Sequence, residues 1–281
     1  MTLQSKQSAQ SAGGGGPPEA EGRLRVGEVL VAAARAAGDP RRIPDALCEE
    51  GVRLLPVTGA SVSISGGRGV QMTWCATDRV AARLAELQYT VGDGPGQTAL
   101  DRGAPVLAAD LAGRRDACRW PIFAHEAVGL GVSAVFSLPL GVSDAVIGTL
   151  DLYCDRVGGL SEPDLRIALW VRDAVTCALL DLRSTCAGTE EGAVDEVASW
   201  VGASGAGHTE VHRAVGMVMV QLDADPEQAL DRMRARAFAE GRTISQIARK
   251  VLARRLRFRP EPDVRCGESR GGESGEGDAD E

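Results

Sequence analysis

The spacing of hydrophobic residues changes along the chain and divides it into two segments. In residues 24–186, helical spacing at 24–37 and 44–55 is followed by two alternating runs, SVSISGG and VQMTWCAT, which predict strands joined by a glycine-rich turn. After a helix at 79–88, two more alternating runs, SAVFSLPLGV and AVIGTLDLYCD, predict a second hairpin. An amphipathic helix at 161–184 closes the segment. This order predicts an α+β fold with an antiparallel sheet and flanking helices.

The second segment, residues 206–259, has a purely helical pattern. Apolar residues recur there at spacings of three and four, which predicts three short helices. The side chain of Asp225 can cap the second helix, which is expected to end at Gly241, and Thr243 forms a capping box with Gln246 for the third. Because three amphipathic helices of this length can share one core, the segment is predicted to be a small all-α domain.

Length and composition complete the domain outline. A chain of 281 residues is long enough for two globular domains with tails. Residues 1–22 are rich in Ser, Gln, Gly and Pro, and residues 260–281 in Gly, Glu, Asp and Ser, so both tails are predicted to be disordered. Residues 187–205 are expected to form a linker or helical connector between the domains.

Three features of the sequence predict a cytoplasmic protein. No stretch approaches the roughly 18 consecutive apolar residues of a membrane span. The N-terminus lacks the charged head and apolar run of a secretory signal. The 7 cysteines are odd in number and widely spaced, without a C-x-x-C pair for zinc or redox chemistry.

Positive charge is concentrated in the second segment. The whole chain has a net charge of -8, yet residues 206–259 carry 11 Lys and Arg against 6 Asp and Glu. A basic module in an acidic protein suggests attraction to phosphate, because the planar guanidinium of arginine donates two parallel hydrogen bonds to a pair of oxygens. The alternative is an ordinary solvated charged surface.

Catalytic and metal-binding patterns are missing from the sequence. It contains no nucleophile elbow, Walker or H-E-x-x-H motif, and no acidic pair comes with a histidine for acid–base work. His208 and His212 are four residues apart, but no third metal ligand lies near them in sequence. The chain is therefore predicted to be neither an enzyme nor a metal-binding protein.

A glycine-punctuated loop and two later strands carry a family resemblance in residues 24–186. They read Tyr89-Thr-Val-Gly-Asp-Gly-Pro-Gly-Gln-Thr-Ala-Leu, then Ala104-Pro-Val-Leu, and later Ser137-Leu-Pro-Leu with Ile147-Gly-Thr-Leu-Asp-Leu-Tyr. In this order they resemble a GAF domain. The resemblance implies a sensory domain that can enclose a small molecule between its sheet and loops.

The residues around such a ligand are harder to predict than the fold. Trp74, Trp120 and Phe136 are the candidates for walls of a pocket, with ordinary core packing as the alternative for all three. The chemical identity of the ligand cannot be read from the sequence, and no cofactor is required by any motif. A small-molecule signal is therefore expected only from the resemblance.

The second segment carries a resemblance of its own. Its residues are Ala214 and Gly216 in the first helix, Ala229-Leu, Met233-Arg and Ala237 in the second, and Ile247-Ala in the third. They resemble an ANTAR domain, a three-helix RNA-binding module of bacterial antitermination regulators. The combination of the two domains resembles the actinobacterial type of these regulators.

The ANTAR resemblance implies contacts with RNA phosphates from basic side chains on the helices. The candidates are Arg213, Arg234, Arg242, Arg249, Lys250 and Arg254. The family commonly has lysine where this chain has Val215, so one phosphate contact is expected to be missing, with Arg213 beside it as a substitute. Ala214 and Gly216 are expected to serve close helix packing.

Together these observations predict a cytoplasmic, signal-responsive transcription regulator that binds RNA hairpins and favours antitermination. Apolar residues at a and d spacing over two heptads of 161–184 predict a homodimer, which would double the basic surface. Two alternatives are left open. One is a DNA-binding helix–turn–helix regulator, and the other is a protein-interaction module whose arginines meet acidic partners.

Overall fold

A five-stranded antiparallel sheet forms the centre of the N-terminal domain. The computed structural model describes residues 17–65, 71–142, 145–186 and 209–259. The strands are β1 Gly59–Ser65, β2 Gln71–Ala76, β3 Val106–Ala108, β4 Ala134–Val142 and β5 Ala145–Cys154, in the order β2-β1-β5-β4-β3. Both hairpins expected from the alternating runs, β1–β2 and β4–β5, are present.

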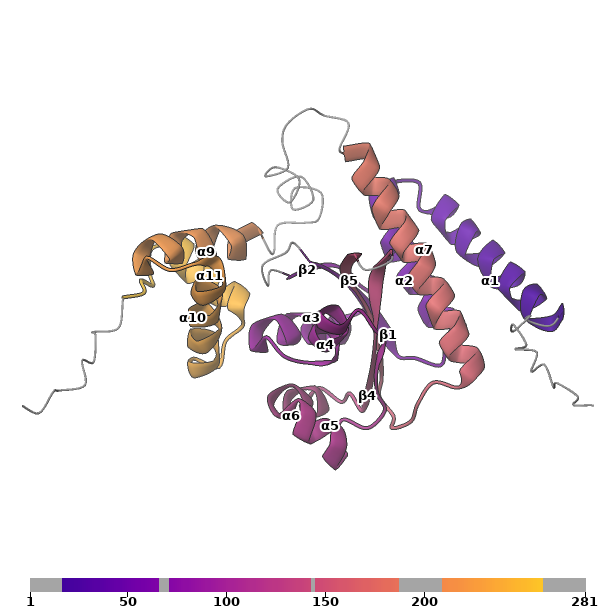
Figure 1. Ribbon diagram of the computed structural model, residues 1–281, viewed down its shortest axis with the longest axis horizontal. Coiled ribbons are helices and arrows are strands. Elements are labelled where there is room, and N and C mark those ends of the chain that lie inside the picture. Colours follow the sequence, from indigo (N-terminus) through magenta and orange to yellow (C-terminus); the bar gives the residue numbers. More distant parts are fainter. Residues whose placement is uncertain (1–16, 66–70, 143–144, 187–208, 260–281) are drawn as a thin grey trace, which may run out of the picture.

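Two helices, α2 and α7, cover one face of the sheet, and α1 packs against their outer side (Figure 1). The bounds of these helices are α1 Pro17–Ala36, α2 Ile43–Leu54 and α7 Glu162–Cys186, and the short 3-10 helix η1 Pro40–Arg42 precedes α2. The long helix α7 buries Ala168, Val171 and Val175 completely, in one cluster with the sheet residues Leu150 and Leu152. The apolar stripe expected to pair two copies of this helix is therefore used inside its own domain.

The opposite face of the sheet is covered by four shorter helices (Figure 1). They are α3 Arg79–Val91, α4 Pro95–Arg102, α5 Arg114–Arg119 and α6 Pro121–Gly129. Asp78 begins α3 by accepting hydrogen bonds from the backbone N–H groups of Val80 and Ala81 at 2.7 and 2.8 Å. Gly92 ends α3 in a left-handed conformation with φ of 73°.

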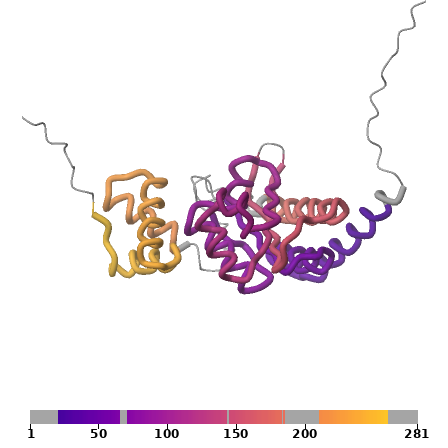
Figure 2. The backbone as a smooth tube through the Cα atoms, turned by 90° about the horizontal axis from the view of Figure 1, so that it is seen from below, coloured from indigo at the N-terminus to yellow at the C-terminus, as the bar shows by residue number. Residues whose placement is uncertain are grey.

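The C-terminal domain is a three-helix unit with its own core. Its helices are α9 Thr209–Leu222, α10 Pro226–Ala239 and α11 Ile244–Leu252. As predicted, Asp225 caps α10 by accepting a hydrogen bond from Gln228 N at 2.8 Å, and Thr243 forms a capping box with Gln246 for α11. In Figures 1 and 2 this domain lies beside α3, on the side of the sheet away from α7.

One strand departs from the predicted alternation of faces. Residues 72, 74 and 76 were expected to share a face of β2, but the register between β1 and β2 shifts between Val62 and Ser63. These residues pair with Cys75 and Thr73, so Trp74 is an extra residue in the strand. Trp74 and Cys75 therefore both pack into the core on the α7 side.

The expected boundaries also change at both ends of the described chain. Helix α1 begins at Pro17, so residues 17–22 of the predicted disordered tail are helical. Helix α11 ends at Leu252, before the end of the segment 206–259 whose pattern is helical throughout. The expectations for residues 1–16, 187–208 and 260–281 lie outside the described residues.

Candidate nucleic-acid interface

The basic side chains of the C-terminal domain surround a core that they do not enter. Val218, Leu230, Met233, Ile247 and Val251 are fully buried between α9, α10 and α11. The apolar faces of the helices pack against one another, which leaves Lys250 and the arginines other than Arg234 on the surface. They do not form one uniform basic face, because some are bound to carboxylates and others are not.

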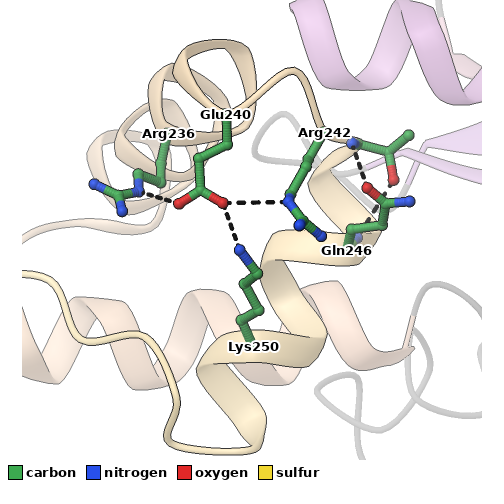
Figure 3. Close-up of polar contacts among 6 residues, drawn as sticks. Arg236, Glu240, Arg242, Gln246 and Lys250 are labelled. Atoms are coloured by element: carbon green, nitrogen blue, oxygen red, sulfur yellow. Dashed lines mark hydrogen bonds and ion pairs between the residues drawn. The ribbon is translucent and has the colours of Figure 1, made fainter.

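Glu240, which follows α10, holds three of the basic residues together (Figure 3). Its carboxylate oxygens lie 2.5 Å from Lys250 Nζ, 2.6 Å from Arg236 Nε and 3.4 Å from Arg242 Nε. Hydrogen bonds from Lys250 and then Arg236 lower the pKa of the Glu240 carboxyl below its ordinary value. Two predicted RNA-binding residues, Arg242 and Lys250, are thus partly neutralised.

Two further candidates also contact carboxylates. Arg249 Nε lies 3.8 Å from Glu210 Oε2 on α9. Arg234 Nη1 lies 3.2 Å from Asp231 Oδ1, and its Nε donates a hydrogen bond to the backbone oxygen of Tyr89 at 3.2 Å. The Arg234 side chain is only 17% exposed. The structure therefore keeps it away from solvent, contrary to its expected role as a free phosphate ligand.

The remaining two candidates, Arg213 and Arg254, line one groove of about 640 Å³. The groove lies between α9 and the chain that follows α11, and its lining residues are Arg213, Gly216, Met217, Val220, Gln221, Val251, Leu252, Arg254, Leu256 and Arg257. No carboxylate is among these residues. In the described part of the chain, Arg213, Arg254 and Arg257 form no ion pair, so three guanidinium groups lie around one uncompensated groove.

A tight turn after α11 builds the second wall of this groove. Arg254 has φ of 56°, a left-handed conformation that is uncommon for a residue with a side chain. The N–H groups of Arg255 and Leu256 donate to Lys250 O at 2.9 and 3.1 Å, which closes the turn. Phe258 N then donates to Gln221 Oε1 of α9 at 2.9 Å. The chain thereby returns to α9 and lies along the groove.

This arrangement can bind an anionic polymer that also has flat apolar parts. The three guanidinium groups can donate to phosphate oxygens and stack on an unpaired base. Val220, which is 86% exposed, and the half-buried Met217 and Leu256 add an apolar floor. Sequence reasoning had not selected Arg257, because it follows the third helix, although apolar residues on both sides of it indicated renewed packing.

The altered family position faces the core. Val215 is 5% exposed and packs with Ala214 in the domain core, so the position where the family commonly has lysine does not reach the groove in this chain. Gly216 was expected to serve close helix packing, but it is exposed, and a Cβ built there would meet no atom within 4 Å. Its lack of a side chain instead leaves the groove open.

The three aromatic residues predicted to wall a ligand pocket are not brought together. Phe136 and Trp74 pack on the α7 side of the sheet, whereas Trp120 is in the cluster on the opposite side. Trp120 Nε1 donates to Thr98 Oγ1 at 3.0 Å, and both Trp120 and Phe136 are 1% exposed. These side chains are core residues, which was the alternative reading.

A buried polar cluster between the sheet and α3 is instead the distinctive interior feature of the N-terminal domain. Asp151 on β5 accepts hydrogen bonds at Oδ2 from Gln88 Nε2 at 3.0 Å and from Thr149 Oγ1 at 3.4 Å. Its Oδ1 is buried without a hydrogen-bond partner of ordinary geometry. Burial raises the pKa of Asp151 to about 6, although Ser137, opposite it in β4, and then Gln88 lower it in part.

No helix in the described ranges is long and apolar enough to cross a membrane. Within the same ranges, no group of three or more His, Cys, Asp or Glu side chains is placed to hold a metal ion.

Comparisons with known proteins identify both domains. Residues 37–169 match the family model of the GAF domain, and residues 205–252 match that of the ANTAR domain. The comparison with curated proteins found no match.

Among solved structures, the chain is similar to several GAF-type folds at low identity. The GAF domain of a phosphoenolpyruvate-protein phosphotransferase from Coxiella burnetii is 13% identical, with a TM-score of 0.46, over 59% of this chain and 97% of that one. The phycocyanobilin-bound GAF domain of a cyanobacterial phytochrome is 14% identical, with a TM-score of 0.43, over 58% and 96%. A type II free methionine-R-sulfoxide reductase from Thermoplasma acidophilum is 14% identical, with a TM-score of 0.39, over 50% and 92%.

The two family matches agree with the two domains of the fold and define a regulatory protein in which a sensor-type domain precedes a helical output domain. The chain is a GAF and ANTAR domain-containing regulator. Its assignment to the actinobacterial type stays a prediction.

Proposed function

We propose that this regulator acts in transcription antitermination by binding structured RNA through its ANTAR domain, under the control of its GAF domain. The observation that carries the proposal is the groove between α9 and the chain after α11. Arg213, Arg254 and Arg257 line it without a carboxylate, next to exposed apolar surface. Unpaired loop nucleotides offer phosphates and base faces together, and duplex DNA does not offer free base faces.

The placement of α11 favours RNA over the helix–turn–helix alternative. A recognition helix inserts its N-terminal residues into the major groove of DNA. Here the N–H groups of Ile244 and Ser245, at the start of α11, donate to Thr90 and Glu86 of α3. The basic groove lies instead along α9 and the chain after α11, and the first residues of α11 do not line it.

The groove can be tested by comparing two nearby arginines. RNA hairpins with random loops would be enriched on the full chain, and the enriched hairpins titrated by fluorescence anisotropy at several salt concentrations. Arg257→Ala should weaken binding about tenfold and reduce the salt dependence by about one counterion, as expected for a lost phosphate contact. Arg255→Ala removes the same charge from an exposed residue that does not line the groove, and should change little.

Several outcomes of this titration would contradict the proposal. Equal loss in the two variants would mean that only net charge matters. Tighter binding to a duplex DNA of the same sequence would favour the helix–turn–helix reading, and the absence of any enriched hairpin would favour a protein-interaction module.

We further propose that the signal is a small molecule that acts on the polar cluster around Asp151 and Gln88. The Oδ1 of Asp151 supports this proposal, because it is a buried acceptor without a hydrogen bond of ordinary geometry, which a ligand could satisfy. A ligand that binds the folded state must raise its melting temperature, so a thermal-shift screen of small molecules tests it. A hit whose shift persists in Asp151→Asn would place the ligand elsewhere.

A homodimer formed in the cytoplasm completes the proposed function. Since the a and d stripe of α7 is buried in its own domain, the pairing surface must be another one. A groove of about 440 Å³ between α1 and α7, with Leu30, Val31, Trp170 and Ala174 among its lining residues, is the surface we propose. Sedimentation equilibrium should give a dimer mass for the wild type and a monomer mass for Val31→Glu. A wild-type monomer would contradict the proposal.

A further inference from the structure

The last turn of α3 packs directly into the ANTAR domain. Tyr89 belongs to the chain segment of the GAF domain, yet it is 2% exposed and clusters with the core residues of α9, α10 and α11. The guanidinium of Arg234 lies over its ring, 5.7 Å from the centroid. A side chain of the sensor domain therefore completes the core of the output domain.

The same turn also binds the start of α11. Thr90 Oγ1 accepts a hydrogen bond from Ile244 N at 3.2 Å, and Glu86 Oε1 accepts one from Ser245 N at 3.4 Å. The first N–H groups of a helix have no acceptor within the helix. The GAF domain thus supplies acceptors that α11 lacks, and these two bonds exist only while the domains are docked.

Gln88 lies between these docking residues but points the other way. Its Nε2 donates to Asp151 Oδ2 at 3.0 Å, and its Oε1 accepts from Gly96 N at 2.6 Å. Gln88 packs closely on Gly96, because a Cβ on Gly96 would approach Gln88 Oε1 to 2.9 Å and Asp151 Oδ2 to 3.0 Å. One turn of α3 therefore forms hydrogen bonds with Asp151 of the sheet on one side and with the start of α11 on the other.

Docking has two consequences for an anionic ligand. It buries Arg234, which would otherwise extend the basic surface of the domain. It also brings the carboxylate of Glu86 next to that surface, where its negative charge repels a phosphate chain. An RNA that uses Arg234 as well as the groove has to displace the last turn of α3.

We propose that the last turn of α3, residues 86–90, is an intramolecular inhibitor that occupies part of the RNA-binding surface of the ANTAR domain. It follows that Gln88 transmits a rearrangement of the polar cluster to this contact. This proposal rests on the proposed function, since it concerns access to the same RNA surface. The docked state binds RNA weakly through the groove alone, and the undocked state binds through the groove and Arg234.

The test opens the contact in the full chain and measures docking separately from RNA binding. Glu86→Gln combined with Thr90→Val weakens both bonds to α11 while leaving Tyr89 and the groove intact. Hydrogen exchange of a peptide covering residues 242–248 reports docking without RNA, because the Ile244 and Ser245 amides lose their acceptors when the domains separate. Glu126→Gln, an exposed carboxylate on α6, is the matched control for the lost charge.

We expect faster exchange at Ile244 and Ser245 in the double variant, together with at least tenfold tighter binding to enriched RNA hairpins, and no change in Glu126→Gln. Should exchange stay slow in the double variant, Tyr89→Ala provides the stronger disruption. Faster exchange with unchanged or weaker RNA binding would overturn the proposal, because docking would then not limit access. Failure of the proposed function looks different: no hairpin binds to any variant, whatever the exchange shows.

Discussion

The buried carboxyl of Asp151 makes the stability of this protein depend on pH in an unusual direction. Its pKa is raised to about 6 in the folded chain by burial, against an unfolded value of about 3.9. The folded state therefore binds more protons than the unfolded state between these values. Stability from the neutral carboxyl is complete below the unfolded pKa and is lost as the pH rises through about 6.

The magnitude follows from the size of the shift. About two pKa units correspond to about 3 kcal/mol between the two limits, at about 1.4 kcal/mol per unit. Between pH 5 and pH 7.5 only the part above pH 5 is lost, which is about 1 kcal/mol. The asparagine in Asp151→Asn cannot ionise, so this contribution is absent from the variant. The change in its unfolding free energy between pH 5 and pH 7.5 should therefore be smaller than that of the wild type by about 1 kcal/mol.

Urea unfolding at pH 5 and pH 7.5, followed by circular dichroism, measures this difference. The quantity of interest is the change between the two pH values in the wild type minus the change in Asp151→Asn. Asp101→Asn, an exposed carboxyl on α4, serves as the control and should resemble the wild type. If Asp151→Asn retains the full pH dependence, the carboxyl is not the buried proton-binding group that the geometry describes.

Three further predictions address the other parts of the chain. Glu240→Gln should tighten RNA binding several-fold and steepen its salt dependence, because Arg236, Arg242 and Lys250 lose their carboxylate partner. Weaker RNA binding of this variant in a salt titration would contradict this. Leu230→Ala should lower the unfolding free energy by about 2–5 kcal/mol, whereas Phe238→Ala, 67% exposed, should cost much less; equal losses in urea unfolding would show that the ANTAR core is not packed as described. Iodoacetamide should modify the exposed Cys118 before the buried Cys75, because a hydrogen bond with the Cys48 thiol, and then burial, raise the pKa of Cys75. Peptide mass mapping measures the order of modification, and modification of Cys75 first would refute this.

The sequence predicted the elements of both domains well because the signals for them are local. The capping roles of Asp225, Thr243 and Gln246 are confirmed, and so are the two hairpins. The extra residue at Trp74 was missed, since a bulge depends on the pairing of two strands and leaves the pattern of a single strand nearly unchanged.

The candidate site was predicted only in part, because charge composition does not reveal which partner each charge meets. Arg213 and Arg254 come together in the groove, but Arg242 and Lys250 meet Glu240, and Arg234 packs on Tyr89. The last contact joins residues 145 positions apart in sequence. A contact between such distant residues depends on the packing of one domain on the other. No local pattern in either segment predicts it.

The turn at Arg254 affects where the output domain can be cut. The ANTAR family match ends at residue 252, and helix α11 ends at Leu252 as well. A recombinant fragment trimmed to either limit would retain the helical core yet lack Arg254, Leu256 and Arg257, and with them one whole wall of the groove. Such a fragment would be a poor surrogate for the intact protein, so a negative binding result obtained with it would carry no weight against an RNA ligand.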